Sequence, residues 1–551
     1  MFHRAISGLI ALLFAAVLAG CGGSSSPAPA PAPAPTPAPT PGPTSMVTIS
    51  GSVTFDRVPV SAATSGLNYN AIRQDPIRGA VVEAVDGAGG VVASDISDDA
   101  GAYAVSVPSN TQVRIRVRAQ VIQTTGATWN VQVLDNTSND APYFLTGSLT
   151  SSGGSDSTRN LNAPSGWNGV QYASPRAAGP FAILDTIYTS LTEFEAVDGA
   201  IAFTPLRVFW SVNNRPSDGD TDDGDIGTSF FTNPNNQPMI FILGAANNDT
   251  DEYDAHVVAH EFGHYIEATL SRSDSIGGAH SLNQRLDARL AFSEGFGNAL
   301  SGILLDDQFY RDSFGASQAR GFFIDNDDNG AAFNNEGWFN EGSAGSIIFD
   351  IADATTDGPD TIAGGLAPIY AALTSSQYRT SPDATTIFLF TDVLRAVTSV
   401  DGAALDALIA NQLINGTGPQ GVGETNNGSI PTSLPVYKQA TVGGPAVQVC
   451  SFDDAGEFNN LGNRDYVRFS LSAPRSVSLR MVRTSGPTGS DPDFSLFERG
   501  VRRANGFSAV SDMETVNIQL GAGEYFVDTY DFNNIDIGGA GNDYCFDFTV
   551  N

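Results

Sequence analysis

Basic residues are scarce in this chain of 551 residues. Only 27 are Lys or Arg, against 60 Asp and Glu, and the formal net charge is −33. A field of that sign repels polyanions, so we exclude a nucleic-acid partner. Charged residues of both signs make up only 16% of the chain and hydrophobic residues 41%, which also excludes wholesale disorder. The acidity is typical of an exported, soluble protein, and some of its carboxylates are candidates for binding Ca²⁺.

Long apolar runs are also missing. Residues 10–18 (IALLFAAVL) are too few for an ordinary membrane span, but they follow His3 and Arg4 and predict an export signal over residues 1–20. The signal ends in LAGC, which resembles the bacterial lipobox. That resemblance implies that Cys21 is acylated and anchors the protein to the bacterial cell envelope, at the outer membrane or cell surface. An ordinary signal peptide with a chance cysteine is the alternative.

A linker follows the signal. Residues 21–45 are rich in Pro, Ala and Thr, cannot build a core, and predict an extended tether.

Cysteine is nearly absent, with three residues in all. If Cys21 carries the lipid, Cys450 and Cys545 remain, and they flank one C-terminal segment. An exported protein meets an oxidising compartment, so we expect a disulfide between them. Two unpaired buried thiols are the alternative.

The hydrophobic pattern divides the rest of the chain and predicts a multidomain protein. Residues 46–120 alternate apolar and polar side chains, as strands do. Their order (ISGSV, then GAV, then SDISDDAGAY into VSVP) resembles the carboxypeptidase regulatory-like β-sandwich, which implies an accessory module. We interpret residues 121–170 as a connector that contains strands.

A mixed α+β domain is predicted over residues 171–440. Apolar residues recur there with a helical period over 180–194, 255–270, 290–305, 345–352, 369–374 and 385–397. Short strands are expected at 226–231 and 238–245, the second as an edge strand that borders the active-site cleft. Residues 441–551 return to a β pattern, and their pieces (DYVRFSLSAPRSVSLRMV, DPDFSLFERG) resemble the bacterial pre-peptidase C-terminal domain. That resemblance implies a second accessory β-sandwich.

The chemistry is concentrated in the middle block, where residues 260–264 read His-Glu-Phe-Gly-His. Residues four apart on a helix share one face, so His260 and His264 can bind one Zn²⁺ while Glu261 acts as general base. A catalytic zinc also needs a third ligand. The metzincin pattern is excluded, because positions 267 and 270 are Glu and Leu.

The third ligand follows from a resemblance. The runs DEYDAHVVAHEFGHYIE and AFSEGFGNALSGIL resemble gluzincin-type metallopeptidases, broadly fungalysin- and thermolysin-like. This implies that Glu294 completes the zinc site in a zincin-like domain, and that Asn298, where the thermolysin family has Asp, supports a ligand histidine. It also implies a His or Tyr that stabilises the oxyanion. We assign that role to His280 and keep His256, Tyr265 and Tyr370 as alternatives.

Two acidic clusters raise the question of calcium. Asp325, Asp327, Asn329 and Glu336 have the spacing of an EF-hand loop, although a solvated acidic turn explains them as well. A second cluster, which includes Asp218, Asp220, Asp222 and Asp225, lacks the closing Glu and is a weaker candidate.

Together these features predict a lipid-anchored zinc metalloendopeptidase that hydrolyses extracytoplasmic proteins or peptides. The competing hypothesis is a surface adhesion or glycan-binding lipoprotein with an inactive or structural zinc site. The retained Glu261 favours the enzyme, since a structural site needs no general base.

Overall fold

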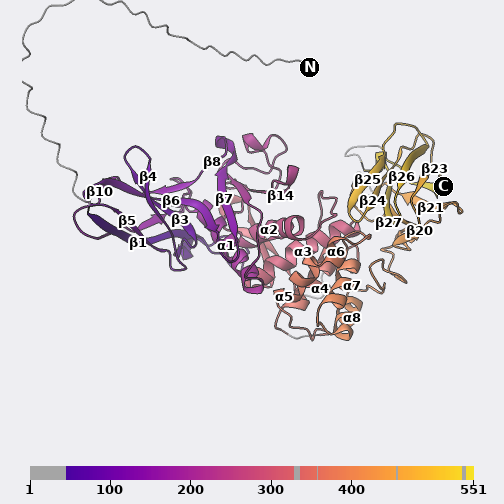
Figure 1. The fold of residues 1–551 in the computed structure, drawn as a ribbon, viewed down its shortest axis with the longest axis horizontal. Coiled ribbons are helices and arrows are strands. Elements are labelled where there is room, and N and C mark those ends of the chain that lie inside the picture. The colour runs from indigo at the N-terminus through magenta and orange to yellow at the C-terminus, as the bar shows by residue number, and fades with distance from the viewer. Residues whose placement is uncertain (1–44, 328–334, 356–357, 454–456, 536–540) are drawn as a thin grey trace, which may run out of the picture. The chain divides into compact units, whose positions relative to one another are not determined.

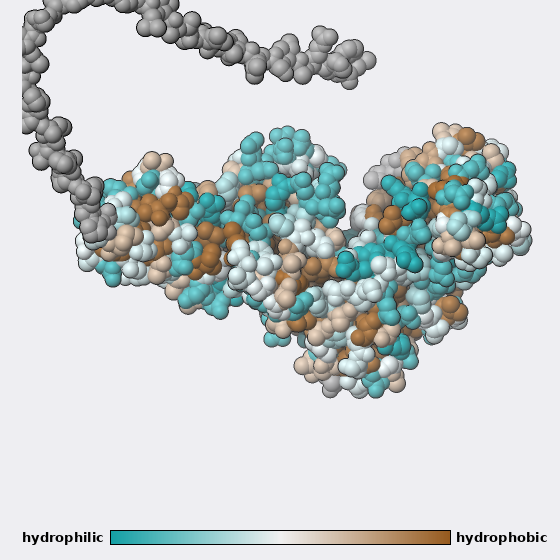
Figure 2. All heavy atoms as spheres, viewed as in Figure 1, coloured by the Kyte–Doolittle hydropathy of each residue, from teal (hydrophilic) through white to brown (hydrophobic). Residues whose placement is uncertain are grey.

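The computed structural model describes residues 45–327, 335–355, 358–453, 457–535 and 541–551 (Figure 1). The chain divides into two units, residues 1–44 and 45–551. The expected signal, Cys21 and nearly all of the tether lie outside the described residues. The second unit is mostly β-sheet, with α-helices concentrated between residues 179 and 411. No helix in the described part is long and apolar enough to cross a membrane, and the face seen in Figure 2 mixes hydrophilic and hydrophobic residues.

The N-terminal strands form the expected β-sandwich. In one sheet β1 (Met46–Arg57) pairs with β2 (Arg73–Pro76), β5 (Ala102–Pro108), β11 (Ser157–Thr158) and β12 (Leu161–Ala163). In the other, β3 (Ala80–Asp86) lies between β4 (Val91–Ile96) and β6 (Gln112–Gln123). Buried side chains from both sheets, such as Ile49 and Val82, belong to one core.

The second of these sheets continues into the central part of the chain. Strand β6 pairs with β7 (Trp129–Asp135), and β13 (Leu206–Trp210), β15 (Met239–Ile242) and β14 (Phe230–Thr232) follow in that order. Three short strands also pair with this sheet. β8 (Ala141–Pro142) pairs with β7, whereas β9 (Phe144–Thr146) and β10 (Thr150–Ser151) pair with β6. One sheet thus runs through the residues that we assigned to the module, the connector and the central domain.

The position of β15 corrects one prediction. We expected the strand at 238–245 to be the edge of this sheet, but β15 pairs with β13 on one side and with β14 on the other. Strand β14, which precedes β15 in the sequence, pairs with it in antiparallel orientation, with Phe231 opposite Ile240. The edge is therefore β14.

The helices agree with the periodicity of the sequence. They are α1 (Gly179–Val197), α2 (Ala255–Leu270), α3 (Ala288–Leu305), α4 (Glu341–Ala352), α5 (Leu366–Thr374), α6 (Ser376–Arg379), α7 (Ile387–Val397) and α8 (Gly402–Asn411). The pattern missed α8 and the short α6. A small sheet lies beside α2 and consists of β16 (Gly244–Ala245), β17 (Asp249–Thr250), β18 (Phe309–Phe314) and β19 (Arg320–Asp325).

The C-terminal strands form a second β-sandwich. One sheet has the order β20 (Tyr437–Gln439), β22 (Arg464–Leu471), β27 (Gly523–Asp531), β24 (Pro492–Glu498), β25 (Val501–Gly506). The other has the order β21 (Val447–Ser451), β28 (Tyr544–Val550), β23 (Arg475–Ser485), β26 (Met513–Leu520). Residues of both, among them Phe469 and Phe546, fill a core of their own.

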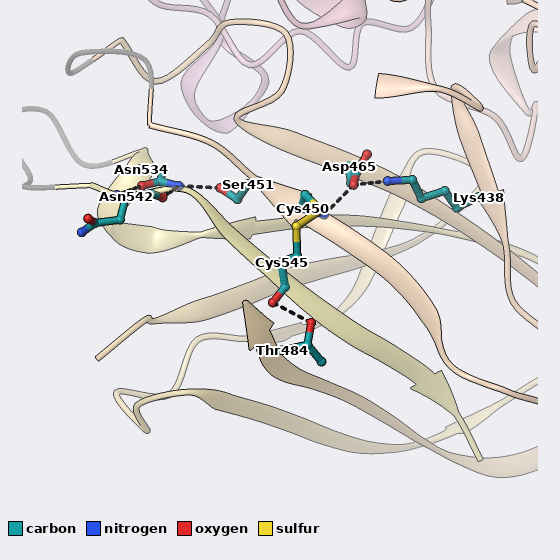
Figure 3. Close-up of a disulfide and its surroundings, with 8 residues drawn as sticks. All are labelled: Lys438, Cys450, Ser451, Asp465, Thr484, Asn534, Asn542 and Cys545. Atoms are coloured by element: carbon teal, nitrogen blue, oxygen red, sulfur yellow. Dashed lines mark hydrogen bonds and ion pairs between the residues drawn. A yellow bond between two sulfur atoms is a disulfide. The ribbon is translucent and has the colours of Figure 1, made fainter. Parts of the chain in front are cut away.

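The structure contains the expected disulfide. Cys450 and Cys545 face each other across the pair β21–β28 and are joined (Figure 3). Next to the bridge, the backbone N–H of Cys450 donates to the Asp465 carboxylate, which also pairs with Lys438. The bridge therefore ties the last strand of the chain to the first strand of its sheet.

We predict that replacing both cysteines by serine destabilises the C-terminal sandwich. The bridge spans 95 residues of sequence, and closing a loop of that length stabilises a fold by about 4 to 5 kcal/mol in the chain-entropy model. A thermal melt of the double variant should show a lower first transition than wild type. Thiol labelling of denatured, unreduced wild-type protein should modify neither residue, and labelling of both would contradict the bridge.

Candidate metal centre

Two crossing helices bring the three expected zinc ligands together. His260 and His264 lie one turn apart on α2, whose buried residues Val258, Phe262 and Ile266 fix the helix in the core. The Nε2 atoms of the two histidines are 3.1 Å apart. Oε2 of Glu294, on α3, is 3.2 Å from the first and 3.4 Å from the second.

These separations suit a metal. Ligands about 2.0 to 2.1 Å from a tetrahedral zinc stand about 3.3 Å from one another. The two Nε2 atoms and Oε2 of Glu294 are spaced at nearly that distance, and all three side chains are largely buried. The residues present therefore fit a zinc ion.

Glycine makes the helix crossing possible. A Cβ on Gly297 would lie 2.8 Å from the imidazole of His260, and one on Gly263 would lie 3.2 Å from the Cα of Gly297. Neither helix could carry a side chain here without separating the two ligand faces. Gly297, the second glycine of the Gly-Phe-Gly that follows Glu294, has this packing role.

Hydrogen bonds orient both imidazoles. His260 Nδ1 is 2.9 Å from Asn298 Oδ1, so the ring donates there and leaves Nε2 free for a metal. His264 Nδ1 lies 3.4 Å from Glu267 Oε2, an oxygen that also accepts from Ser293 at 2.6 Å. Asn298 thus stands in the expected supporting place, whereas sequence reasoning missed Glu267 and Ser293.

Electrostatics show that the site favours a positive charge. Burial opposes the charged form of His264, but the Glu294 and Glu267 carboxylates outweigh it and raise the pKa of His264 well above its usual range. Burial also opposes ionisation of Glu294, yet His264 and the hydrogen bonds from both imidazoles hold the pKa of Glu294 well below its usual range. Both shifts have the direction expected of a site that stabilises positive charge.

Glu261 lines a cleft of about 910 Å³ that also contains the three ligands. Burial raises the pKa of the Glu261 carboxyl above its usual range. A raised pKa suits a group that must accept and release a proton near neutral pH.

His280 reaches the same cleft. Its Nδ1 donates to the carbonyl of Gly278 at 3.1 Å, and its Nε2 lies 3.2 Å from Glu294 Oε2 and 3.7 Å from Glu341 Oε2. Glu341 begins α4 and is buried, and burial raises its pKa to about 7. Sequence reasoning missed Glu341, because nothing in its local pattern separates it from an ordinary acidic residue in a first helical turn.

The alternatives to His280 have other partners. His256 Nδ1 lies 3.2 Å from Ser301 Oγ, and burial lowers its pKa. The Tyr265 hydroxyl donates to the Thr204 carbonyl, and the Tyr370 hydroxyl donates to Asp198. Tyr310, which we did not predict, does line the cleft, and its ring centre is 6.0 Å from that of His260.

The two expected calcium clusters differ in what the structure shows. Asn329 lies outside the described residues, so the loop from Asp325 to Glu336 stays a prediction; Asp325 itself accepts from Gln308 at 2.9 Å. In the second cluster Asp225 pairs with Arg215 at 2.7 Å and Asp220 accepts from the backbone of Asp222. Those two carboxylates are thus bound by groups of the protein.

The C-terminal part of the chain helps to hold this site. Asn459 Nδ2 donates to the carbonyl of Ala279 at 2.5 Å, next to His280. The backbone of Asn459 accepts from Asp287, and Leu461 donates to Arg285, just before α3. The module that we interpreted as accessory therefore supports both the His280 loop and the start of the helix that carries Glu294.

Comparisons with known proteins give no match to a family or to a curated protein, and three similar solved structures each cover about a fifth of the chain. Among solved structures, it is similar to the pre-peptidase C-terminal domain of a Bacillus anthracis collagenase (13% identity, 21% of this chain and 94% of that chain, TM-score 0.16). It is also similar to Aeromonas hydrophila PliG, a periplasmic inhibitor of g-type lysozyme (14% identity, 21% and 99%, TM-score 0.14). A third is CorA, a surface-associated copper-binding protein of Methylomicrobium album BG8 (7% identity, 21% and 98%, TM-score 0.15).

We predict that Gly297→Ala weakens zinc binding by at least tenfold. The new methyl group would meet the His260 ring at 2.8 Å, so the ring must move out of line with the other two ligands. Zinc retained after dialysis against a competing chelator measures the effect. Gly402→Ala is the matched control, because there the methyl group meets only the tip of Arg395 at 3.4 Å. Equal zinc retention in wild type and Gly297→Ala would contradict the packing argument.

Proposed function

We propose that this protein is a zinc-dependent endopeptidase of the gluzincin type, with a zincin-like central domain. One observation carries the proposal: three ligand atoms, on buried His260 and Glu294 and half-buried His264, stand 3.1 to 3.4 Å apart beside Glu261 in a cleft of about 910 Å³. A cleft of that volume admits several residues of a peptide.

His260, His264 and Glu294 would hold the zinc. In a site with three protein ligands, zinc supplies Lewis-acid chemistry, which acidifies water and polarises a carbonyl. Asn298 and Glu267 would keep the two imidazoles in the orientation and tautomer that expose Nε2.

Glu261 would move the proton. It follows a ligand histidine on the same helix and faces the cleft, so it can accept the proton of the attacking water and return it to the amine nitrogen that leaves. Its raised pKa suits both steps.

His280 would donate to the carbonyl oxygen as negative charge develops there. Its Nδ1 already donates to Gly278, so Nε2 carries a hydrogen only when the ring is protonated. Burial opposes protonation, but Glu294 and Glu341 outweigh it and raise the pKa of His280. Donors placed where charge develops are worth several kcal/mol in related sites, roughly 3 to 4 per donor.

The substrate class follows from the edge strand. Ser229, Phe230 and Phe231 at β14 line the cleft, and β14 is the last strand of its sheet. An exposed edge can pair with an extended peptide through the backbone, which gives affinity without demanding one sequence. We propose unfolded or extended segments of extracytoplasmic proteins as substrates, reached from a lipid anchor at Cys21.

The alternative is a binding lipoprotein with a structural zinc, which normally has four protein ligands. His280 is the candidate for a fourth ligand. However, its Nε2 groups with Glu294 and Glu341 rather than with His260 and His264. This grouping favours an open position on the metal, and hence the enzyme.

We predict that Glu294→Ala loses zinc, because two imidazoles alone bind it far more weakly than three ligands do. Metal analysis of the purified variant should find well below one zinc per chain, against about one in wild type. Near-stoichiometric zinc in the variant would show that another residue is the third ligand.

We predict that Glu261→Gln keeps zinc but lowers hydrolysis of casein by roughly 10²- to 10⁴-fold, since an amide cannot accept the proton of water. Metal analysis and a casein assay on the same preparation test both parts. Glu193→Gln, on the exposed face of α1, is the matched control and should keep full activity. Full activity in Glu261→Gln would refute the mechanism, and two equally inactive proteins would favour the binding lipoprotein.

A further inference from the structure

Four aspartates meet beside the start of the zinc-binding helix, and the proposed reaction uses none of them. Asp249 is on β17, Asp251 follows it, Asp254 is the N-cap residue of α2, and Asp312 is on β18. One carboxylate oxygen each of Asp249, Asp251 and Asp312 lies within 4.8 Å of the other two.

The burial of these groups sets them apart from a solvated acidic cluster. Asp251 is 3% exposed and Asp254 is 0% exposed. In each of the four aspartates, Oδ1 is buried and accepts no hydrogen bond from the described residues. A buried carboxylate oxygen without a partner costs free energy, so native proteins rarely keep one unless an ion or water satisfies it.

In Asp251 and Asp254 the other carboxylate oxygen already has a partner. Oδ2 of Asp251 accepts from Ser229 Oγ. Oδ2 of Asp254 accepts from the backbone N–H of Ser313 at 3.1 Å and from its hydroxyl at 2.7 Å. In both residues these bonds leave Oδ1 without a partner among the described residues.

The negative charges of these four carboxylates repel one another. After burial, the strongest influences on Asp251 are the charges of Asp312, Asp249 and Asp254, and all of them raise its pKa. Burial first, and then Asp249, raises the pKa of Asp312 to about 7. The group therefore needs a positive charge or protons to remain buried.

We propose that Asp249, Asp251 and Asp312 bind a calcium ion, with the buried carboxylate of Asp254 beside them. All the ligands are hard oxygens, and no nitrogen or sulfur ligand groups with them among the described residues, so the donor set suits Ca²⁺ rather than zinc. Asp249, Asp251 and Asp312 also line the cleft, from which water can complete the six to eight ligands that Ca²⁺ takes.

The ion would connect the segment before α2 with the hairpin formed by β18 and β19, because it would have ligands from both. Asp251 lies three residues before Asp254, the N-cap residue of the helix that carries His260, and Asp312 comes from the strand that also carries Tyr310 at the cleft. Calcium would thus stabilise the wall of the active site without contacting the zinc ligands.

Calcium titration of the purified protein tests the site. The protein should carry Glu261→Gln, so that self-digestion cannot confuse the result, and zinc content should be measured before and after. We expect one calcium bound with zinc unchanged, and a melting temperature that rises by several degrees with calcium concentration. No calcium uptake by zinc-loaded protein would overturn the proposal and would leave protonated carboxyls as the explanation; because calcium and zinc are counted separately, that result leaves the proposed peptidase untouched.

Two variants locate the ion. Asp312→Asn and Asp251→Asn keep the shape of the side chain and should each weaken calcium binding about tenfold or more. Without calcium, both should melt at or above the wild-type temperature, because one repelling charge is gone. Asp547→Asn, at an exposed position of β28, is the control and should behave as wild type. Unchanged calcium affinity in both variants, or its loss in Asp327→Asn alone, would place the ion elsewhere and refute the site.

Discussion

The close crossing of α2 and α3 is the constraint on which the site depends. Three ligand atoms can stand 3.1 to 3.4 Å apart only if two helices approach until their backbones nearly touch, and Gly263 and Gly297 allow this. The same requirement recurs where α3 meets α4, because a Cβ on Gly295 would lie 2.4 Å from the carbonyl of Glu341. The two glycines that follow Glu294, Gly295 and Gly297, therefore let the ligand helix pack on both neighbours, and Glu341 reaches the cleft as a consequence.

Local patterns were sufficient for most of the helices, although not for α6 and α8, and for the pair of histidines on α2. The prediction of a helix over 255–270 matches α2, because its apolar spacing reflects one buried face. Features that depend on long-range pairing were not predictable in this way. Whether β15 is an edge depends on where residues 230–232 turn back, and Asp251 and Asp312 meet only because β17 pairs with β18. A single sequence contains no periodicity that reports such contacts.

The C-terminal sandwich is a part of the site as well as a separate core. Arg289, near the start of α3, pairs with Asp287 at 2.9 Å and with Asp528 of β27 at 3.2 Å, and it is 3% exposed. Tyr466 of β22 also donates to Asp287 at 2.5 Å. Removing one partner of a buried charge pair is strongly destabilising, because the other charge remains uncompensated. Loss of the sandwich would therefore expose unpaired charges at the helix that carries Glu294.

Some of the acidic residues of this chain are buried, and each of these needs a group that balances its charge. A net charge of −33 is tolerable on a surface, where water and salt screen it, but not for carboxylates that are buried together. Glu294 is balanced by the imidazoles around it and Asp287 by Arg289. For Asp249, Asp251, Asp254 and Asp312 the neighbouring charges are those of one another. Protein residues, or a metal on three ligands, thus balance the charges of Glu294 and Asp287. The charges of the four aspartates can be balanced only by protons or by a cation. A cation is the simpler solution for carboxylates that are buried together, and with zinc between α2 and α3 it would place two metals of different chemistry along one helix.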